Sequence, residues 1–208
     1  MTGFRVGVDI GGTFTDIVLI NAEGRLVTKK ISSSVSNYAT AIVDGLAELF
    51  DSAGIAAGEI QEVMHGTTVA SNAILELKGA KVGLIGTDGF RDILEIRNLR
   101  MPRLYDLEWV KPPPLVERYL RVTVQERIDA KGNIEQELTR EDAEAAVSKL
   151  VDQGVEAIAV CLLNSYANPV HEKLIAEAIE AKARVLPYCI SFDILPEIKE
   201  YERTSTTV

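Results

Sequence analysis

Polar and apolar residues alternate on both sides of a glycine pair close to the N-terminus. Residues 4–8 show this alternation before Gly11 and Gly12, and residues 14–20 resume it before a polar turn at 21–24. A period of two is typical of strands that bury one face. We therefore expect a three-stranded antiparallel meander within the first thirty residues.

Apolar side chains then recur every three or four positions over residues 39–50, and Gly54 follows them. This spacing predicts a helix that ends near the glycine and packs on the meander. Residues 63–65 and 81–85 resemble two further strands. Between them, we expect a helix that Thr67 or Thr68 caps and that ends near residue 77, so this segment is predicted to form a βαβ unit.

Four prolines interrupt the pattern within residues 98–117. Proline lacks a backbone N–H and fixes its own φ, so we expect no regular structure there. We accordingly divide the chain into a first part at 1–97, a connecting loop at 98–117 and a second α/β part at 118–208.

Strands and helices alternate in the second part. In order, we expect a strand at 118–128, a turn at 130–133, a helix that Thr139 caps and that ends near 152, a buried strand at 155–163, a helix from Asn168-Pro169 to about 182, and a strand at 184–190. The last three elements predict an additional βαβ unit. The β-branched residues 204–208 are typical of the entrance to another strand.

The composition is that of an acidic globular protein, with 208 residues, a net charge of −9 and 47% hydrophobic residues. This charge argues against a general nucleic-acid surface, which needs clustered Lys and Arg. No apolar run approaches the roughly 20 residues of a membrane helix, and no signal peptide is visible. Because Cys161 and Cys189 lie in apolar runs, we expect reduced thiols and a cytoplasmic protein. From the charge and the short apolar runs, we expect it to bind neither nucleic acid nor membrane.

The glycine turn carries a dense set of groups suited to nucleotide phosphates. Glycines let backbone N–H groups approach an anion, hydroxyls add neutral donors, and carboxylates can hold Mg²⁺ through water. The candidates are Gly11, Gly12, Thr13 and Thr15 for phosphate, and Asp9 and Asp16 for the metal and for catalysis. The missing Lys excludes a Walker loop, and the missing third Gly excludes a dinucleotide fingerprint. A plain hairpin is the alternative.

This hairpin resembles the first phosphate motif of the actin, sugar kinase and heat-shock ATPase superfamily. The whole chain resembles the N-terminal region of the hydantoinase A and oxoprolinase family. The stretches that carry this resemblance are VDIGGTFTD (8–16), HGTTVASNAILELKGAKVGLI (65–85), GFRDILEI (89–96), RLYDL (103–107), GVEAIAVCLLNSYANPVHE (154–172) and LPEIKEYERTSTTV (195–208).

The resemblance implies an α/β fold of the actin-like, ribonuclease H-like kind, with a mixed sheet and the additional βαβ unit. It implies ATP and Mg²⁺ as cofactors, a hydantoinase B-type subunit as partner, and an oligomer. It places the second phosphate motif and the adenosine motif in a later domain. We therefore expect a fragment of a longer polypeptide, which alone binds ATP weakly or not at all and has no turnover.

The leading interpretation is the nucleotide-phosphate-binding domain of an ATP-dependent cyclic amide hydrolase of the hydantoinase or 5-oxoprolinase type. One alternative is the matching subunit of an ATP-dependent carboxylase of ketones such as acetone or acetophenone. The other is a non-catalytic, actin-like nucleotide switch module.

Further candidates lie outside the hairpin. His65 is suited to carry a proton near neutral pH, and Thr67 and Thr68 mark a helix N-terminus able to bind an anion or substrate. Their structural alternative is local hydrogen bonding and helix capping.

Arginines and hydroxyls form a last group of candidates for substrate binding. Arg97 is suited to a substrate carboxylate, and Arg203 and Thr204 lie among several hydroxyls near residue 208. A solvated charged face and an ordinary helix end are the structural alternatives.

Overall fold

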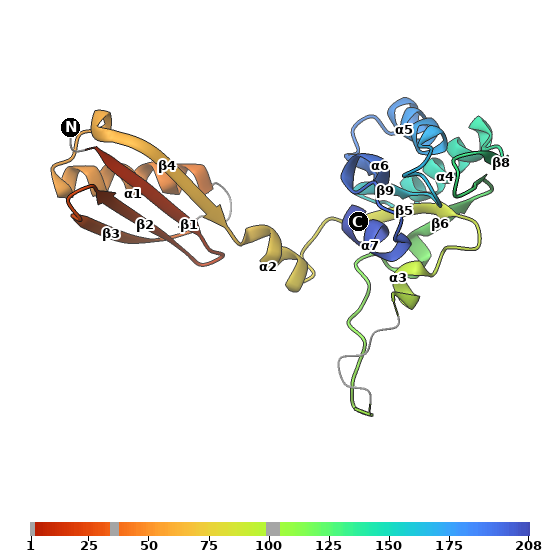
Figure 1. The fold of residues 1–208 in the computed structure, drawn as a ribbon, viewed down its shortest axis with the longest axis horizontal. Coiled ribbons are helices and arrows are strands. Elements are labelled where there is room, and N and C mark those ends of the chain that lie inside the picture. Colours follow the sequence, from red (N-terminus) through yellow and green to blue (C-terminus); the bar gives the residue numbers. More distant parts are fainter. Residues whose placement is uncertain (1–2, 34–37, 99–104) are drawn as a thin grey trace. The chain divides into compact units, whose positions relative to one another are not determined.

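A computed structural model describes residues 3–33, 38–98 and 105–208 of the chain (Figure 1). The chain divides into two compact units, Met1–Lys78 (unit 1) and Gly79–Val208 (unit 2). The segment expected as a connecting loop lies within unit 2. Its first part, including Arg103 and Leu104 of the RLYDL stretch, falls outside the described residues.

Unit 1 is a four-stranded sheet that one long helix covers. Strands β1 (Phe4–Ile10), β2 (Phe14–Asn21) and β3 (Leu26–Ser32) form the expected antiparallel meander, which is confirmed. β4 (Ile60–Thr67) pairs parallel with β1 at the edge, so the sheet is mixed, with the order β3-β2-β1-β4. Helix α1 (Tyr38–Ala53) packs its apolar side chains on this sheet, and the short helix η1 (Ala57–Glu59) leads from it to β4 (Figure 1).

The alternation along β1 decides what lies on each face of this sheet. Val6, Val8 and Ile10 are buried in the core beneath α1, whereas Asp9 is exposed. Successive side chains of a strand point to opposite faces. Asp9 therefore lies on the face away from the core.

The βαβ unit expected at residues 63–85 is wrong. Helix α2 (Val69–Leu75) follows β4 as predicted, but β5 (Val82–Thr87) pairs with strands of unit 2 and not with β4. The local pattern predicts each element but not its partner, because the partner strand comes from a distant segment.

Unit 2 is built on a parallel sheet with the order β10-β9-β5-β6. Its other strands are β6 (Arg121–Val124), β9 (Ala157–Cys161) and β10 (Tyr188–Ile190), and every neighbouring pair is parallel. β9 is a nearly continuous apolar strand because both of its faces are covered. The additional βαβ unit at the end of the chain is confirmed, since helix α5 (Val170–Lys182) joins β9 to β10.

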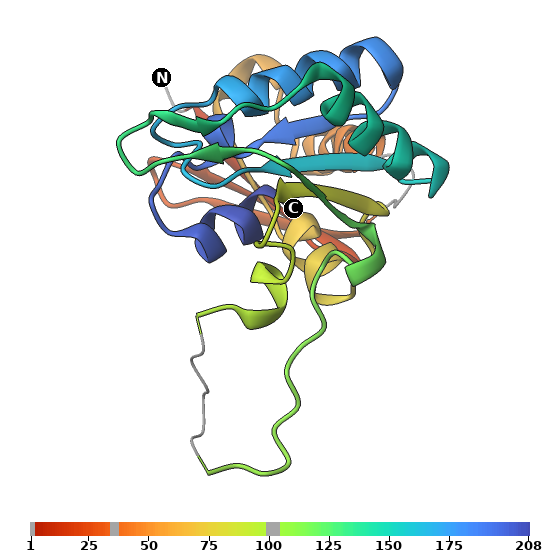
Figure 2. The same cartoon turned by 90° about the vertical axis from the view of Figure 1, so that its right-hand side faces the viewer.

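Helices lie on both faces of this sheet (Figure 2). Helix α4 (Arg140–Asp152) packs with α5 on one face, and α7 (Glu200–Thr207) packs on the other with α3 (Ile93–Ile96). The remaining short elements are η2 (Arg118–Leu120), β7 (Arg127–Ile128), β8 (Ile134–Gln136) and α6 (Ser191–Ile194). The single strand expected at 118–128 is thus η2, β6 and β7.

The strand expected at residues 204–208 is wrong, because these residues complete α7. The hydroxyls of Thr204, Thr206 and Thr207 donate to carbonyl oxygens one turn earlier, at 2.8, 2.7 and 2.7 Å. Threonine tolerates a helix when its hydroxyl makes this bond. Burial of Arg203 in the same helix adds tertiary contacts that outweigh the β preference of the sequence.

Gly83→Ala tests the packing of α4 on β5. A Cβ at Gly83 would lie 2.8 Å from two methyl carbons of the buried Leu150, whereas one at Gly58 would meet nothing within 4 Å. We expect Gly83→Ala to lower the free energy of unfolding by about 1–3 kcal/mol in urea denaturation. Gly58→Ala is the control, and equal stability of the two variants would contradict this packing.

Candidate functional site

The turn between β1 and β2 is held in one shape by its own backbone and by Ser33. The Gly11 N–H donates to the Phe14 carbonyl at 3.0 Å, and the Ser33 N–H donates to the Thr13 carbonyl at 2.9 Å. The Ser33 hydroxyl donates to the Gly11 carbonyl at 2.8 Å. A Cβ at Gly11 would lie 2.8 Å from the Phe14 carbonyl oxygen, so only glycine fits there. The turn is therefore preorganised.

Thr15 supports this turn from the core side. Its side chain is 1% exposed, and its hydroxyl lies 2.9 Å from the Ser33 hydroxyl. Because the single hydroxyl proton of Ser33 is donated to the Gly11 carbonyl, Thr15 is the donor of this bond. The structure thus places Thr15 behind the turn, while Gly12 and Thr13 are exposed.

A cleft of about 440 Å³ lies between the turn and α2. Gly12 and Thr13 line it from the turn, and Asn72 and Lys78 line it from α2 and the segment after it, together with Val69, Ala73 and Glu76. A Cβ at Gly12 would lie 3.4 Å from Asn72 Nδ2. Any larger side chain at Gly12 would therefore extend toward Asn72 and into the cleft.

Asp9 and Asp16 lie directly opposite each other on β1 and β2. Lys30, the partner of Asp16 on β3, donates to both oxygens of Asp16 at 2.9 and 3.0 Å. Among the described residues, the Asp9 carboxylate has no hydrogen-bond or ion-pair partner. Gly66 stands beside Asp9 on β4, where a Cβ would lie 4.0 Å from Asp9 Oδ1. Asp9 is therefore the free carboxylate of the pair.

Thr67 and Thr68 join β4 to α2. The Thr67 hydroxyl donates to the Ile10 carbonyl at 3.3 Å and accepts from the Val69 N–H at 3.2 Å. The Thr68 hydroxyl accepts from Asn72 Nδ2 at 3.5 Å, and Asn72 lines the cleft. The structure thus brings Thr68 close to the cleft and gives Thr67 a role in holding β4 to β1.

The structure does not bring His65 beside the carboxylates. His65 pairs with Val8, which is buried, so its side chain lies on the opposite face of the sheet from Asp9. The side chain is exposed at the edge of that face.

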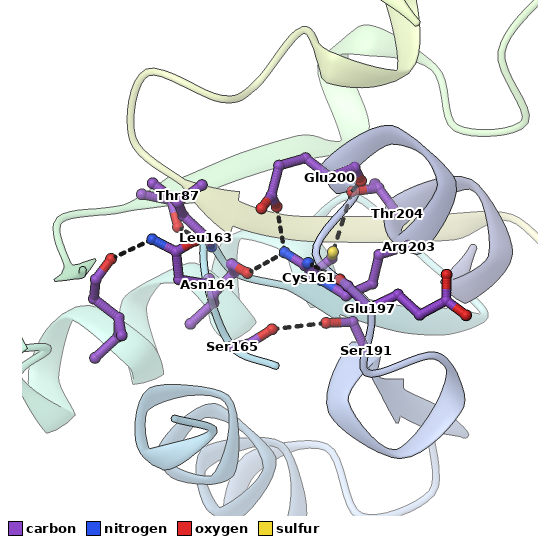
Figure 3. Close-up of polar contacts among 12 residues, drawn as sticks. Thr87, Cys161, Leu163, Asn164, Ser165, Ser191, Glu197, Glu200, Arg203 and Thr204 are labelled. Carbon is purple, nitrogen blue, oxygen red and sulfur yellow. Dashed lines mark hydrogen bonds and ion pairs between the residues drawn. The ribbon is translucent and has the colours of Figure 1, made fainter. Parts of the chain in front are cut away.

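Arg203 and Thr204 lie inside unit 2, where they attach α7 to β9 (Figure 3). Arg203 is 0% exposed and donates to the Leu162 carbonyl at 2.9 Å and to the Glu200 carboxylate. The Thr204 hydroxyl lies 3.1 Å from Cys161 Sγ, a thiol whose pKa is raised by burial. Both predicted substrate residues thus make contacts within the unit, although Arg203 Nε is buried without a hydrogen-bond partner among the described residues.

Arg97 follows α3 with an unusual backbone. Its φ is +60° and its ψ is −147°, a conformation that costs a non-glycine residue about 1–3 kcal/mol. Its N–H donates to the Ile93 carbonyl at 2.9 Å, and its guanidinium donates to the Pro112 carbonyl. The first bond fixes the backbone of Arg97, and the second holds its side chain against the segment of three consecutive prolines at 112–114, the proline segment.

Unit 2 also holds two buried carboxylates, Glu172 and Glu126, that could not be identified as such from the sequence. Glu172 accepts from the Leu162 N–H at 2.9 Å, the Ser191 hydroxyl at 2.6 Å and the Phe192 N–H at 3.0 Å. Burial raises the pKa of this carboxyl above its ordinary value. The only signal was a glutamate placed one position after His171, in a stretch otherwise taken as an ordinary helix start.

Glu126 is the second buried carboxylate. It accepts from the Thr87 hydroxyl and lies 2.8 Å from His171 Nδ1. Since the Leu138 N–H donates to His171 Nε2 at 3.3 Å, the proton of the neutral ring belongs on Nδ1, which donates to Glu126. A charged residue in an alternating segment gave no signal of this role.

Two negative findings apply to the described ranges 3–33, 38–98 and 105–208. They contain no group of three or more His, Cys, Asp or Glu side chains arranged to hold a metal ion. They also contain no helix with the length and hydropathy needed to span a membrane.

Comparison with known proteins identifies the family of this chain. Residues 5–183 match the family described as the hydantoinase/oxoprolinase N-terminal region. Caprolactamase subunit alpha of Pseudomonas jessenii is 36% identical over 211 residues, which are 99% of this chain and 30% of that protein.

Solved structures show the same relationship. The crystal structure of the ATP-dependent caprolactamase from Pseudomonas jessenii matches with a TM-score of 0.84 at 35% identity, covering 98% of this chain and 30% of that one. A nucleotide-free structure of acetone carboxylase, from work on ATP-dependent acetone carboxylation, matches with a TM-score of 0.88 at 28% identity, covering 100% and 32%. The chain thus spans about a third of the length of these relatives.

Glu172→Gln tests the buried carboxyl of unit 2. The amide nitrogen of glutamine cannot accept one of the three donors, so we expect a loss of about 1–3 kcal/mol in the free energy of unfolding at pH 4. The raised pKa means that the folded state holds this proton longer than the unfolded state, whose carboxyl titrates near 4.5. The stability of the parent chain relative to the variant therefore falls as the pH rises above that value.

The measurement is urea denaturation of both proteins at several pH values, with the exposed Glu135→Gln as control. A stability difference that grows as the pH rises would contradict the direction of the pKa shift.

Proposed function

Since the chain belongs to the hydantoinase/oxoprolinase family, we propose that unit 1 binds the nucleotide phosphates of an ATP-dependent enzyme that opens a cyclic amide. We place these residues within a polypeptide of the relatives' length, because the chain spans about a third of each. Caprolactamase, by its name an enzyme of a lactam, supports a cyclic amide as the substrate.

The observation that carries this proposal is the preorganised turn beside an open cleft. Gly12 and Thr13 present an exposed backbone and a hydroxyl to a cleft of about 440 Å³. Lys78 lines the other side, where it is paired with Glu76 at 2.6 Å, so it would neutralise a phosphate only after that pair opens. Phosphoryl transfer needs mainly positioning and neutralisation of charge. We assign the phosphate contacts to Gly12 and Thr13. The N–H and carbonyl of Gly11 are engaged within the turn, so Gly11 holds the turn in place together with Thr15 and Ser33.

The donor groups fit magnesium as the accompanying ion. Mg²⁺ takes oxygen ligands and is often bound through one or two carboxylates together with water and phosphate. Asp9 would hold it, because its carboxylate is exposed and without a partner among the described residues. Asp16 would join only after its pair with Lys30 opens. When bound, the ion supplies neutralisation of the phosphate charge.

We propose an actin-like, ribonuclease H-like fold for unit 1. A meander of three antiparallel strands, extended by a parallel strand beside β1 and covered by α1, supports this assignment. In such a fold the turn after the first strand meets nucleotide that a second domain also contacts, which agrees with a phosphate half-site in this chain.

The chemistry of a cyclic amide explains why ATP is needed. The carbonyl carbon of a lactam is a poor electrophile, since the ring nitrogen donates electron density to it. Transfer of the γ-phosphoryl group to the carbonyl oxygen forms an O–P bond, breaks the bond to the β-phosphate, and leaves an imidate phosphate that water can attack. We assign to this chain the positioning of ATP for that step.

A ketone carboxylase is the second candidate, and the match to acetone carboxylase favours it. In that reaction ATP would activate the ketone for carboxylation. The third candidate is a nucleotide switch without turnover. In that case, phosphate binding would only close the nucleotide-binding domain on the later domain of the longer polypeptide. For either enzyme we propose a hydantoinase B-type partner subunit, since the caprolactamase relative is a subunit of an assembly.

Gly12→Val and Asp9→Asn test the phosphate site in the complete polypeptide that carries these residues. Valine would extend into the cleft and asparagine removes the free carboxylate, so we expect affinity for Mg²⁺-ATP to fall at least about tenfold in calorimetry. Asp44→Asn, an exposed change on α1, is the matched control. Unchanged affinity in both test variants would overturn the site.

Steady-state ATP hydrolysis, measured with the partner subunit present, distinguishes the three functions. Stimulation by lactams without bicarbonate is expected for the cyclic amide hydrolase, and dependence on a ketone plus bicarbonate would replace it with the carboxylase. Binding of ATP without stimulation by any of these compounds would favour the switch.

A further inference from the structure

A second pocket, of about 120 Å³, lies in unit 2 between α3, α7 and the proline segment. Its walls combine apolar residues, among them Leu94 and Pro114, with a nearly equal polar surface. Its polar groups come from Arg97, Tyr201 and Ser205. None of these residues belongs to the nucleotide site of unit 1.

The helical period of α7 separates this pocket from the buried contacts of the same helix. Arg203 and Thr204 point into the unit, where the Arg203 Nη atoms and the Thr204 hydroxyl form hydrogen bonds. Tyr201 and Ser205, four positions apart, share the other face with Val208 and line the pocket. Hydroxyls that adjoin each other in the sequence thus serve two different places.

Among the described residues that line the pocket, Arg97 alone has a charged side chain. One of its guanidinium nitrogens donates to the Pro112 carbonyl, which fixes the side chain. Among the described residues, the other guanidinium N–H groups and the Tyr201 hydroxyl have no hydrogen-bond partner. The described residues that line the pocket bring no carboxylate side chain to it. A planar fork of free N–H groups in such a pocket favours a planar anion that can accept two bonds.

We propose that this pocket binds the carboxylate of a small organic acid whose apolar body lies against Leu94 and Pro114. Arg97 forms the charged hydrogen bonds, and the Tyr201 hydroxyl donates a further one. The pocket is smaller than the apolar cavity of about 150 Å³ that holds benzene, but it is partly open, so a compact ring would be partly enclosed and partly exposed to solvent. That this acid is the substrate of the ATP-dependent reaction rests on the proposed function, whereas the binding of a carboxylate does not.

The test is an NMR titration of the complete polypeptide that carries these residues, with cyclopentanecarboxylate and with its neutral analogue cyclopentanecarboxamide. We expect the acid to shift the amide signals of Arg97, Ser205 and Val208 with a dissociation constant in the millimolar range. The neutral analogue should bind at least about tenfold more weakly, because it lacks the charge that pairs with the guanidinium.

Two variants and two controls locate the effect. Arg97→Gln should weaken binding of the acid at least about tenfold, and Tyr201→Phe, which removes one hydroxyl only, about threefold. Arg184→Gln and Tyr119→Phe change exposed residues of unit 2 away from the pocket and should leave binding unchanged. Thermal unfolding of each variant shows whether it is folded. If Arg97→Gln does not fold, Tyr201→Phe alone tests the proposal.

Three results would overturn the proposal: equal binding of acid and amide, unchanged binding in the folded variants, or equal competition by inorganic phosphate. The outcome is independent of the nucleotide site. ATP turnover without carboxylate binding in this pocket would contradict only the proposed carboxylate site. Carboxylate binding without any ATP turnover would contradict only the proposed function.

Discussion

The arrangement of unit 1 depends on the pairing of β1 on both of its edges. β1 is antiparallel to β2 and parallel to β4, so its alternation is imposed on both neighbours. With Val8 in the core, Asp9, Asp16 and Gly66 share the outer face and His65 does not. A slip of one residue would carry Asp9 into the core, so burial of the apolar residues of β1 also secures the position of the free carboxylate.

In unit 2, two buried carboxylates fix the arrangement of the helices and strands around them. Glu126 and Glu172 collect donors from segments that are distant in sequence, at the ends of β5 and β9 and at the start of α5. A buried charge or dipole whose partners are all present is costly to disturb. These two groups therefore give the sheet, α5 and α6 one defined arrangement, on which the position of α7 in turn depends.

Local signals predicted much of the fold. The meander and the last βαβ unit were predictable from periodicity, and the start of α4 from Thr139, which accepts from the Asp142 N–H at 3.1 Å. The partner of β5 and the helical state of residues 204–207 were not, because both depend on burial against distant segments.

The candidate site shows the same division. Its turn residues could be read from the sequence, because their chemistry is contained in one short motif. The pair of Lys30 with Asp16, the support that Ser33 gives to the turn, and the grouping of Tyr201 with Arg97 required the register of the strands and the packing of α7. Side chains that act from a second segment cannot be assigned from the motif alone.

The position of β4 at the edge of its sheet has a consequence for synthesis. All four strands of that sheet lie within the first 67 residues, so the sheet can form on the ribosome before most of unit 2 has been made. Its outer edge then presents eight residues of backbone, with Val63 58% and Met64 50% exposed. Such an edge is a template for pairing with another nascent chain. Because this edge is complete once residue 67 has been made, such pairing can begin while the rest of the chain is still being synthesised.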